Sequence, residues 1–247
     1  MPPRSRQQSR RPFAGKLALI TGANRGIGLA VARTLAAEGC DLIITGRDAR
    51  ALSKAGRELA SSRVSVLAQT CDVRNPNSVD DLFALIRGLR RPLDFLINNA
   101  GAAHPNRNVM ELPYPVWSAV IDTNLNGLFL VTQAALAVMK RGSVIVNNLS
   151  IAAERVFAGS SAYNASKHGA LGFTDTLREE LRPKGVRVVA LMPGATDTEI
   201  WKTMWPKAPR KKMLSPETVA AAVRNALLVP ENGTIEKVVL MPAGGAL

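Results

Sequence analysis

A tyrosine and a lysine stand four residues apart, at Tyr163 and Lys167, and Ser150 precedes the tyrosine by thirteen residues. On a helix, two residues at this spacing share one face, with Cβ atoms roughly 5 to 6 Å apart. An ammonium about 4 Å from a phenol, at an effective dielectric of about 20, favours the tyrosinate by roughly 4 kcal/mol, which burial partly opposes. The pattern predicts acid/base chemistry by Tyr163, with its pKa lowered well below the usual value of about 10.

A glycine-rich segment near the start of the chain predicts a dinucleotide site. It reads TGANRGIG from Thr21 to Gly28, follows a short apolar run and precedes a helical pattern. Glycine lets the backbone approach a pyrophosphate closely, and the free N–H groups at the start of the helix bind its charge. The residues expected to form this loop are Gly22, Asn24, Arg25, Gly26, Ile27 and Gly28.

The end of the next apolar run bears on which dinucleotide binds. NAD sites usually place Asp or Glu there to accept from the ribose 2′-hydroxyl. Here Gly46 takes that place and Arg47 follows, while Arg25 could reach the same region. One charge-assisted bond from a guanidinium to a 2′-phosphate corresponds to a preference of roughly 10- to 150-fold. We therefore expect NADPH/NADP+ as cofactor; Asp48 opposes this, and the alternative is two solvated surface arginines.

The elements that must position these residues follow from a regular alternation of apolar runs and amphipathic segments. Helical segments begin near Gly26, Ala49, Asn77, Pro115, Ser160 and Ser215. The expected strands are 16–21, 41–45, 64–68, 93–98, 143–148, 186–192 and 235–241. Such βαβ units predict an α/β, Rossmann-type doubly wound parallel sheet of about seven strands, with helices on both faces.

Length and composition indicate one catalytic domain. The 247 residues fit a single dinucleotide-binding domain over 15–247, with a short substrate lid near 196–214. Residues 1–14 form a basic segment that we expect to be disordered. No apolar run approaches the roughly 20 residues of a membrane span, and no export signal is visible, so we expect a cytoplasmic protein.

Charge and cysteine content exclude other classes of site. The net charge is +13, and nine of the positive charges lie in two acid-free segments, 1–12 and 201–212. A basic tail and a basic loop do not make a nucleic-acid-binding fold, so no nucleic-acid partner is expected. Cys40 and Cys71 are expected to be small buried side chains, with neither a disulfide nor a metal site.

The order and spacing of these segments resemble those of the short-chain dehydrogenases/reductases over about residues 15–245. The glycine loop matches the TGxxxGxG pattern of that family, and Asn98 to Gly101 matches its NNAG strand end. The resemblance implies that Asp72 and Val73 contact adenine and that Pro193, Gly194 and Thr198 bind the nicotinamide end. It also implies cofactor contacts from Asn99, Ala100, Gly101, Tyr163 and Lys167.

The resemblance further implies a catalytic tetrad of Asn124, Ser150, Tyr163 and Lys167. Ser150 would polarise the substrate oxygen, Lys167 would hold the nicotinamide ribose, and Asn124 would anchor a water relay to Lys167. The implied reaction is hydride transfer between NADPH and a carbonyl or secondary alcohol, similar to that of 3-oxoacyl carrier protein reductases. The alternative is a non-catalytic NADPH-binding regulatory or scaffold protein, which would need no such tetrad.

The sequence says less about the substrate and the oligomeric state than about the cofactor and the reaction. Trp201, Trp205 and five basic residues occupy the lid, which either attracts a phosphorylated, carboxylated or carrier-bound substrate or is a basic surface loop. His104 either lines the pocket or is a solvated loop residue, and we expect the second. The segments 115–140 and 160–182 carry more apolar residues than one buried face requires, which favours a homodimer or homotetramer. The family's aspartate before Gly244 and Gly245 is absent, which leaves dimer versus tetramer open.

Overall fold

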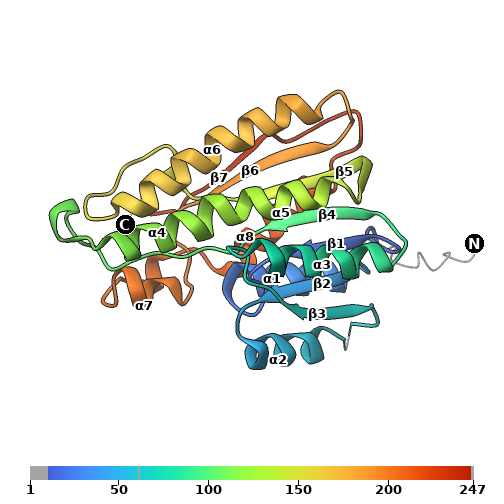
Figure 1. The fold of residues 1–247 in the computed structure, drawn as a ribbon, viewed down its shortest axis with the longest axis horizontal. Coiled ribbons are helices and arrows are strands. Elements are labelled where there is room, and N and C mark those ends of the chain that lie inside the picture. The colour runs from blue at the N-terminus through green and yellow to red at the C-terminus, as the bar shows by residue number, and fades with distance from the viewer. Residues whose placement is uncertain (1–10, 61, 246–247) are drawn as a thin grey trace, which may run out of the picture.

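The computed structural model describes residues 11–60 and 62–245. They form a parallel sheet in the order β3-β2-β1-β4-β5-β6-β7, with helices on both faces (Figure 1). Its strands are β1 (Leu17–Ile20), β2 (Asp41–Gly46), β3 (Val66–Thr70), β4 (Leu93–Asn98), β5 (Met139–Asn148), β6 (Arg187–Pro193) and β7 (Lys237–Leu240). The predicted Rossmann-type fold is confirmed.

Two layers of helices bury the sheet. On one face lie α1 (Gly26–Ala37), α2 (Ala49–Ala60) and α8 (Pro216–Leu227). On the other lie α3 (Pro76–Gly88), α4 (Tyr114–Ile121), α5 (Gly127–Leu136) and α6 (Ser161–Leu181). Alternate residues of β1 point to opposite layers, Ala18 and Ile20 to the first and Leu17 and Leu19 to the second. Continuous apolar strands are the usual mark of a parallel sheet covered on both sides.

The predicted helix over 115–140 is broken in the structure. A π-helical turn, Asp122–Asn126, separates α4 from α5, and α5 ends at Leu136. After α5 the chain pairs with the start of β4, where the N–H of Leu93 donates to the carbonyl of Val138 at 2.9 Å. β5 therefore begins at Met139, earlier than predicted, with a register irregularity before it settles against β4.

The end of the basic segment differs from the sequence expectation. Residues 1–10 lie outside the described part of the chain, but 11–14 are packed on the domain. Phe13 is only 3% exposed, and its ring meets that of Phe95 edge to face at a centroid distance of 5.3 Å. The expected disorder therefore does not extend to these residues, because Phe13 fills a place in the core.

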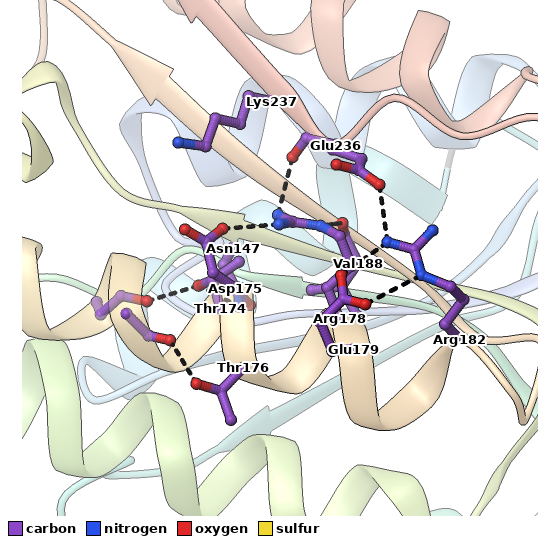
Figure 2. Close-up of polar contacts among 12 residues, drawn as sticks. Asn147, Thr174, Asp175, Thr176, Arg178, Glu179, Arg182, Val188, Glu236 and Lys237 are labelled. Carbon is purple, nitrogen blue, oxygen red and sulfur yellow. Dashed lines mark hydrogen bonds and ion pairs between the residues drawn. The ribbon is translucent and has the colours of Figure 1, made fainter.

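Buried polar contacts fasten α6 to the sheet (Figure 2). Arg178 is 7% exposed and donates from Nε to the carbonyl of Val188 at 3.0 Å and from Nη2 to that of Glu236 at 3.1 Å. One turn earlier on α6, Thr174 Oγ1 accepts from Asn147 Nδ2 of β5 at 3.0 Å. These contacts fix the position of α6 relative to β5, β6 and the segment before β7.

Within residues 11–60 and 62–245, no helix is both long enough and apolar enough to span a bilayer. Cys40 and Cys71 are buried and unpaired, as expected of small core side chains.

Candidate active site

The glycine loop joins the end of β1 to the first turn of α1. Gly22 has φ +63°, and a Cβ there would lie 3.0 Å from Ala100 Cα. A Cβ on Gly28 would lie 2.4 Å from Asn99 Nδ2, so both positions require glycine. No side chain caps the start of α1, which leaves its first N–H groups available to an anion.

Asn99, just after β4, ties this loop to the next strand. Its Nδ2 donates to the carbonyls of Thr21 at 2.9 Å and Gly22 at 3.1 Å. The backbone N–H groups of Asn99 and Ala100 both donate to Thr21 Oγ1 at 2.9 Å. The two segments that resemble cofactor-binding motifs are thus joined directly.

An open cleft of about 850 Å³ runs along the carboxyl ends of the strands. Gly28 does not line it, since this residue packs behind the loop, and Asn124 borders an adjoining cavity of about 10 Å³ that it shares with Lys167. The predicted site residues that line the cleft are Gly22, Asn24, Arg25, Gly26, Ile27, Arg47, Asp72, Val73, Asn99, Ala100, Gly101, Ser150, Tyr163, Lys167, Pro193, Gly194 and Thr198.

At one end of the cleft, Arg47 follows β2 with an exposed side chain. A Cβ on Gly46 would lie 3.0 Å from Asn24 Oδ1, so Asn24 covers the place of the expected acid. The neighbouring Asp48 caps α2, because its Oδ1 accepts from the N–H groups of Arg50 and Ala51, both at 3.0 Å. That carboxylate is therefore hydrogen-bonded to the start of the helix, and no ion pair between Asp48 and Arg47 is found within the described residues.

Asp72 lies beside the same end of the cleft and is held by a residue that the sequence reading missed. Arg74 Nη2 donates to Asp72 Oδ2 at 2.6 Å, and its Nε to Oδ1 at 2.9 Å. Hydrogen bonds from Arg74 lower the pKa of the Asp72 carboxyl, despite partial burial, and the charge of Arg47 acts in the same sense. The available sequence signal was a cation two residues beyond the acid.

At the other end of the cleft, α6 brings Tyr163 and Lys167 beside Ser150, which follows β5. Ser150 Oγ accepts from the N–H of Ala152 at 3.1 Å, and Ser150 lines the cleft together with Tyr163. Lys167 Nζ lies 5.6 Å from the centroid of the Tyr163 ring and donates to the carbonyl of Asn148 at 3.1 Å. A phenol, a hydroxyl and an ammonium therefore converge on one wall.

The electrostatics of this wall correct one sequence expectation. Burial raises the pKa of Tyr163, and the hydrogen bond with Ser150 opposes this only in part. Burial also lowers the pKa of Lys167 to about 8. The predicted lowering of the Tyr163 pKa was wrong because burial removes water from the phenol, and this effect outweighs the stabilisation of the tyrosinate. Tyr163 is thus a protonated acid at neutral pH.

Asn124 lies in the π-helical turn between α4 and α5. Its Oδ1 accepts from the N–H of Ala102 at 2.8 Å, and its Nδ2 donates to the Ala102 carbonyl and to Ser166 Oγ, both at 2.9 Å. The side chain joins the segment after β4 to α6, one residue before Lys167. A π-helical turn at this place matches the frequent occurrence of such turns at functional sites.

The segment 196–214, predicted to form a lid, borders the cleft. Its ends meet in a parallel bridge between Thr196 and Leu214, and it contains the short helix α7 (Ile200–Met204). Trp201 Nε1 donates to the carbonyl of Thr196 at 2.8 Å, and Trp201 lines the cleft. The lining residues that the sequence reading did not predict include Asn106, Asn148, Val156 and Phe157.

His104 corrects another expectation. It is 2% exposed, with Nδ1 2.8 Å from the carbonyl of Pro105, and does not line the cleft. The loop that contains His104 contacts the lid, because the N–H of Asn106 donates to the carbonyl of Met204 at 3.4 Å. The prediction that His104 is solvated was therefore wrong. His168 is exposed on α6.

Comparison with known proteins agrees with this geometry. Residues 16–209 match the short chain dehydrogenase family profile. An uncharacterized oxidoreductase of Staphylococcus aureus strain N315 is 33% identical, over 92% of this chain and 97% of its own. An alcohol dehydrogenase of Thermococcus sibiricus, solved with 5-hydroxy-NADP, is 30% identical with a TM-score of 0.86, covering 92% and 97%. An actinorhodin polyketide ketoreductase variant with NADPH is 31% identical with a TM-score of 0.81, covering 92% and 96%. Matched motifs, fold and full-length similarity together place this chain in the short chain dehydrogenase family of oxidoreductases.

Proposed function

We propose that the protein is an NADPH-dependent reductase or dehydrogenase that interconverts a carbonyl and a secondary alcohol. The observation that carries the proposal is the convergence of Ser150, Tyr163 and Lys167 on one wall of the cleft whose other end holds the glycine loop. The solved relatives with NADP-type cofactors support it.

When bound, the cofactor supplies or takes the hydride. The chain's own residues handle the proton and the oxygen. Ser150 and Tyr163 line the same part of the cleft, and a carbonyl oxygen bound between them would accept from both hydroxyls. Tyr163, whose pKa is raised, stays protonated at neutral pH and gives its proton as negative charge develops on that oxygen. Lys167 places a positive charge beside the tyrosinate that remains.

The preference for NADPH rests on Arg47 and Arg25. Both line the cleft, and Asn24 occupies the place over Gly46 where an acid would bind a ribose 2′-hydroxyl. A 2′-phosphate would meet cationic side chains at this end, since Asp48 is turned to α2 and Asp72 is paired with Arg74. A guanidinium is well suited to such a phosphate.

The substrate class follows from the walls near Tyr163. Apolar residues of two segments line the cleft, Ile200, Trp201 and Met204 from the lid and Val156 and Phe157 from the segment after β5. Two basic lid residues are already paired, Lys202 with Glu199 and Arg210 with Asp197. Lys207, Lys211 and Lys212 do not line the cleft. We therefore infer a carbonyl compound with an apolar substituent.

The test is turnover with a panel of ketones and aldehydes, small and carrier-bound, followed by NADPH absorbance. We expect Tyr163→Phe to bind NADPH almost as well as the wild type while losing most turnover, by about 10² to 10⁴-fold. The exposed Tyr114 offers the matched control, since Tyr114→Phe should change neither quantity. Near-wild-type turnover by Tyr163→Phe would remove the assigned role. NADPH binding with no turnover across the panel would favour the non-catalytic alternative.

A further inference from the structure

Asn148, the last residue of β5, contacts both halves of the site. Its carbonyl accepts the hydrogen bond from Lys167 Nζ at 3.1 Å. Its Nδ2 donates to Asn99 Oδ1 at 2.9 Å. One residue therefore connects the lysine of the catalytic wall with the asparagine that holds the glycine loop.

The neighbouring contacts determine which way the Asn148 amide points. Asn99 uses Nδ2 to donate to the carbonyls of Thr21 and Gly22, so it can present only Oδ1 to Asn148. The atom of Asn148 that meets it must then be the donor Nδ2, because a flipped amide would bring two acceptors together. The oxygen of Asn148 consequently lies on the other side of its amide.

That oxygen is a buried acceptor with no donor. Within the described residues, Asn148 Oδ1 is shielded from solvent and has no hydrogen-bond partner. Folded proteins rarely leave a buried acceptor unpaired, because its desolvation is then uncompensated. Asn148 lines the cleft together with Ser150, Tyr163, Lys167 and Pro193. Because Asn148 lines the cleft, a small movement of the side chains that cover Oδ1 would let a molecule bound at this end of the cleft bring the missing donor.

We propose that Asn148 Oδ1 accepts a hydrogen bond from the nicotinamide half of the cofactor. This rests on the proposed function, in which the adenine half lies toward Arg47 and the nicotinamide half toward Tyr163. The donors that this half carries are its ribose hydroxyls and its carboxamide N–H groups. Asn148 is then a binding residue for one half of the cofactor, in addition to positioning Lys167 and Asn99.

The experiment compares three ligands of increasing length by calorimetric titration: adenosine 2′-phosphate 5′-diphosphate, 2′-phospho-ADP-ribose and NADPH. Asn148→Leu should lower the affinity for NADPH by about 5- to 30-fold and leave the affinity for the shortest ligand almost unchanged. Weakening of 2′-phospho-ADP-ribose as well assigns the bond to a ribose hydroxyl. Weakening of NADPH alone assigns it to the carboxamide.

Asn147→Leu is the matched control. Asn147 is the preceding residue of β5, its amide is satisfied by Asn98 and Thr174, and it does not line the cleft. Disturbance of the strand alone would therefore appear in both variants and with all three ligands. If Asn148→Leu does not unfold cooperatively, Asn148→Val gives the same comparison.

Two results would overturn the inference. Equal weakening of all three ligands would mean that Asn148 acts only through Asn99 and the glycine loop. Unchanged affinity for all three would mean that Oδ1 is satisfied by water, for which the cavity of about 10 Å³ bordered by Asn148 and Lys167 has room. Failure of the wild type to bind NADPH would instead reject the proposed function itself, and this inference with it.

Discussion

Burial acts in opposite directions on Tyr163 and Lys167, although they lie one helical turn apart. It raises the pKa of the phenol and lowers that of the ammonium to about 8. The neutral form is favoured in both cases, since charge is costly where water is excluded. At neutral pH, Tyr163 can therefore donate its proton while Lys167 carries its charge. As the pH rises, the charge of Lys167 is lost before the proton of Tyr163.

We predict that the carbonyl reduction rate is level at neutral pH and falls as the pH rises through about 8, because Lys167 loses its proton there. Tyr163, with its raised pKa, does not titrate in this range. Lys167→Arg should move the decline to higher pH, since arginine stays protonated beyond a pH of about 12. The measurement is kcat/KM against pH, with Lys184→Arg on the surface as control. An unmoved decline in Lys167→Arg would assign it to another group.

We predict that the wild type binds NADPH at least about tenfold more tightly than NADH, equivalent to ~1.4 kcal/mol. Arg47→Asp should reverse much of this preference, because a carboxylate repels the 2′-phosphate and accepts from a 2′-hydroxyl. Arg87→Asp on α3 changes the net charge equally, is exposed and does not line the cleft, so it controls for long-range attraction. Equal wild-type affinities in a titration would contradict the cofactor assignment.

Among single residues, the features set by the local sequence could be predicted, whereas the features set by the tertiary environment could not. The glycine loop, Arg47 and the Tyr163–Lys167 pair were readable because their chemistry depends on spacing along one segment. The raised pKa of Tyr163 and the burial of His104 were not, because both depend on packing by distant segments. Asn148 was missed because its environment arises only when the ends of β4 and β5 lie side by side.

Among the elements, the strands were predicted well because each is a short apolar run between turns. The π-helical turn was not, since apolar residues continue through 115–136 and one inserted residue leaves no gap in that pattern. The turn nevertheless decides where Asn124 points, and Asn124 in turn sets the distance between Ala102 and Ser166 of α6. The periodicity of the sequence predicts that a helix forms here but not its local winding.

The contacts of Arg178 support a prediction about α6. Arg178→Leu removes the donors to the carbonyls of Val188 and Glu236, and we expect the free energy of unfolding to drop by about 2 to 4 kcal/mol. Arg182→Leu is the matched control, one turn farther and exposed, where surface ion pairs contribute about 1 kcal/mol or less. Urea unfolding measures both. Similar losses for the two variants would mean that burial of Arg178 adds nothing.

The outer faces of α5 and α6 bear on assembly. Phe129 is 45% exposed, and its ring meets that of Phe173 edge to face at a centroid distance of 6.1 Å. Gly172 on α6 is exposed with nothing within 4 Å of its would-be Cβ, which leaves room for close approach of another helix. An apolar, shallow face of this kind suits a second copy of the chain related by a two-fold axis.

We predict a homodimer or homotetramer, with an interface of at least about 1,200 Å² over these helices. Phe129→Asp should lower the mass measured by light scattering across a concentration series in moderate salt, because a carboxylate would be buried there. Leu228→Asp, at an exposed position after α8, is the control. A mass of one chain at all concentrations would exclude the assembly, and an unchanged oligomer in Phe129→Asp would place the interface elsewhere.

The closed base of the lid has a consequence for how the protein can change over evolution. Thr196 and Leu214 are bridged, and the N–H of Asp197 bonds the carbonyl of Leu214 at 2.8 Å, so the segment between them leaves and rejoins the domain at one point. Closing a loop of twice the length costs only about 0.6 kcal/mol more. Insertions or deletions here therefore leave β6 and the proton-transfer residues in place. If this segment selects the substrate, as proposed, natural selection can change the substrate by replacing the segment without altering the residues proposed to carry out the reaction.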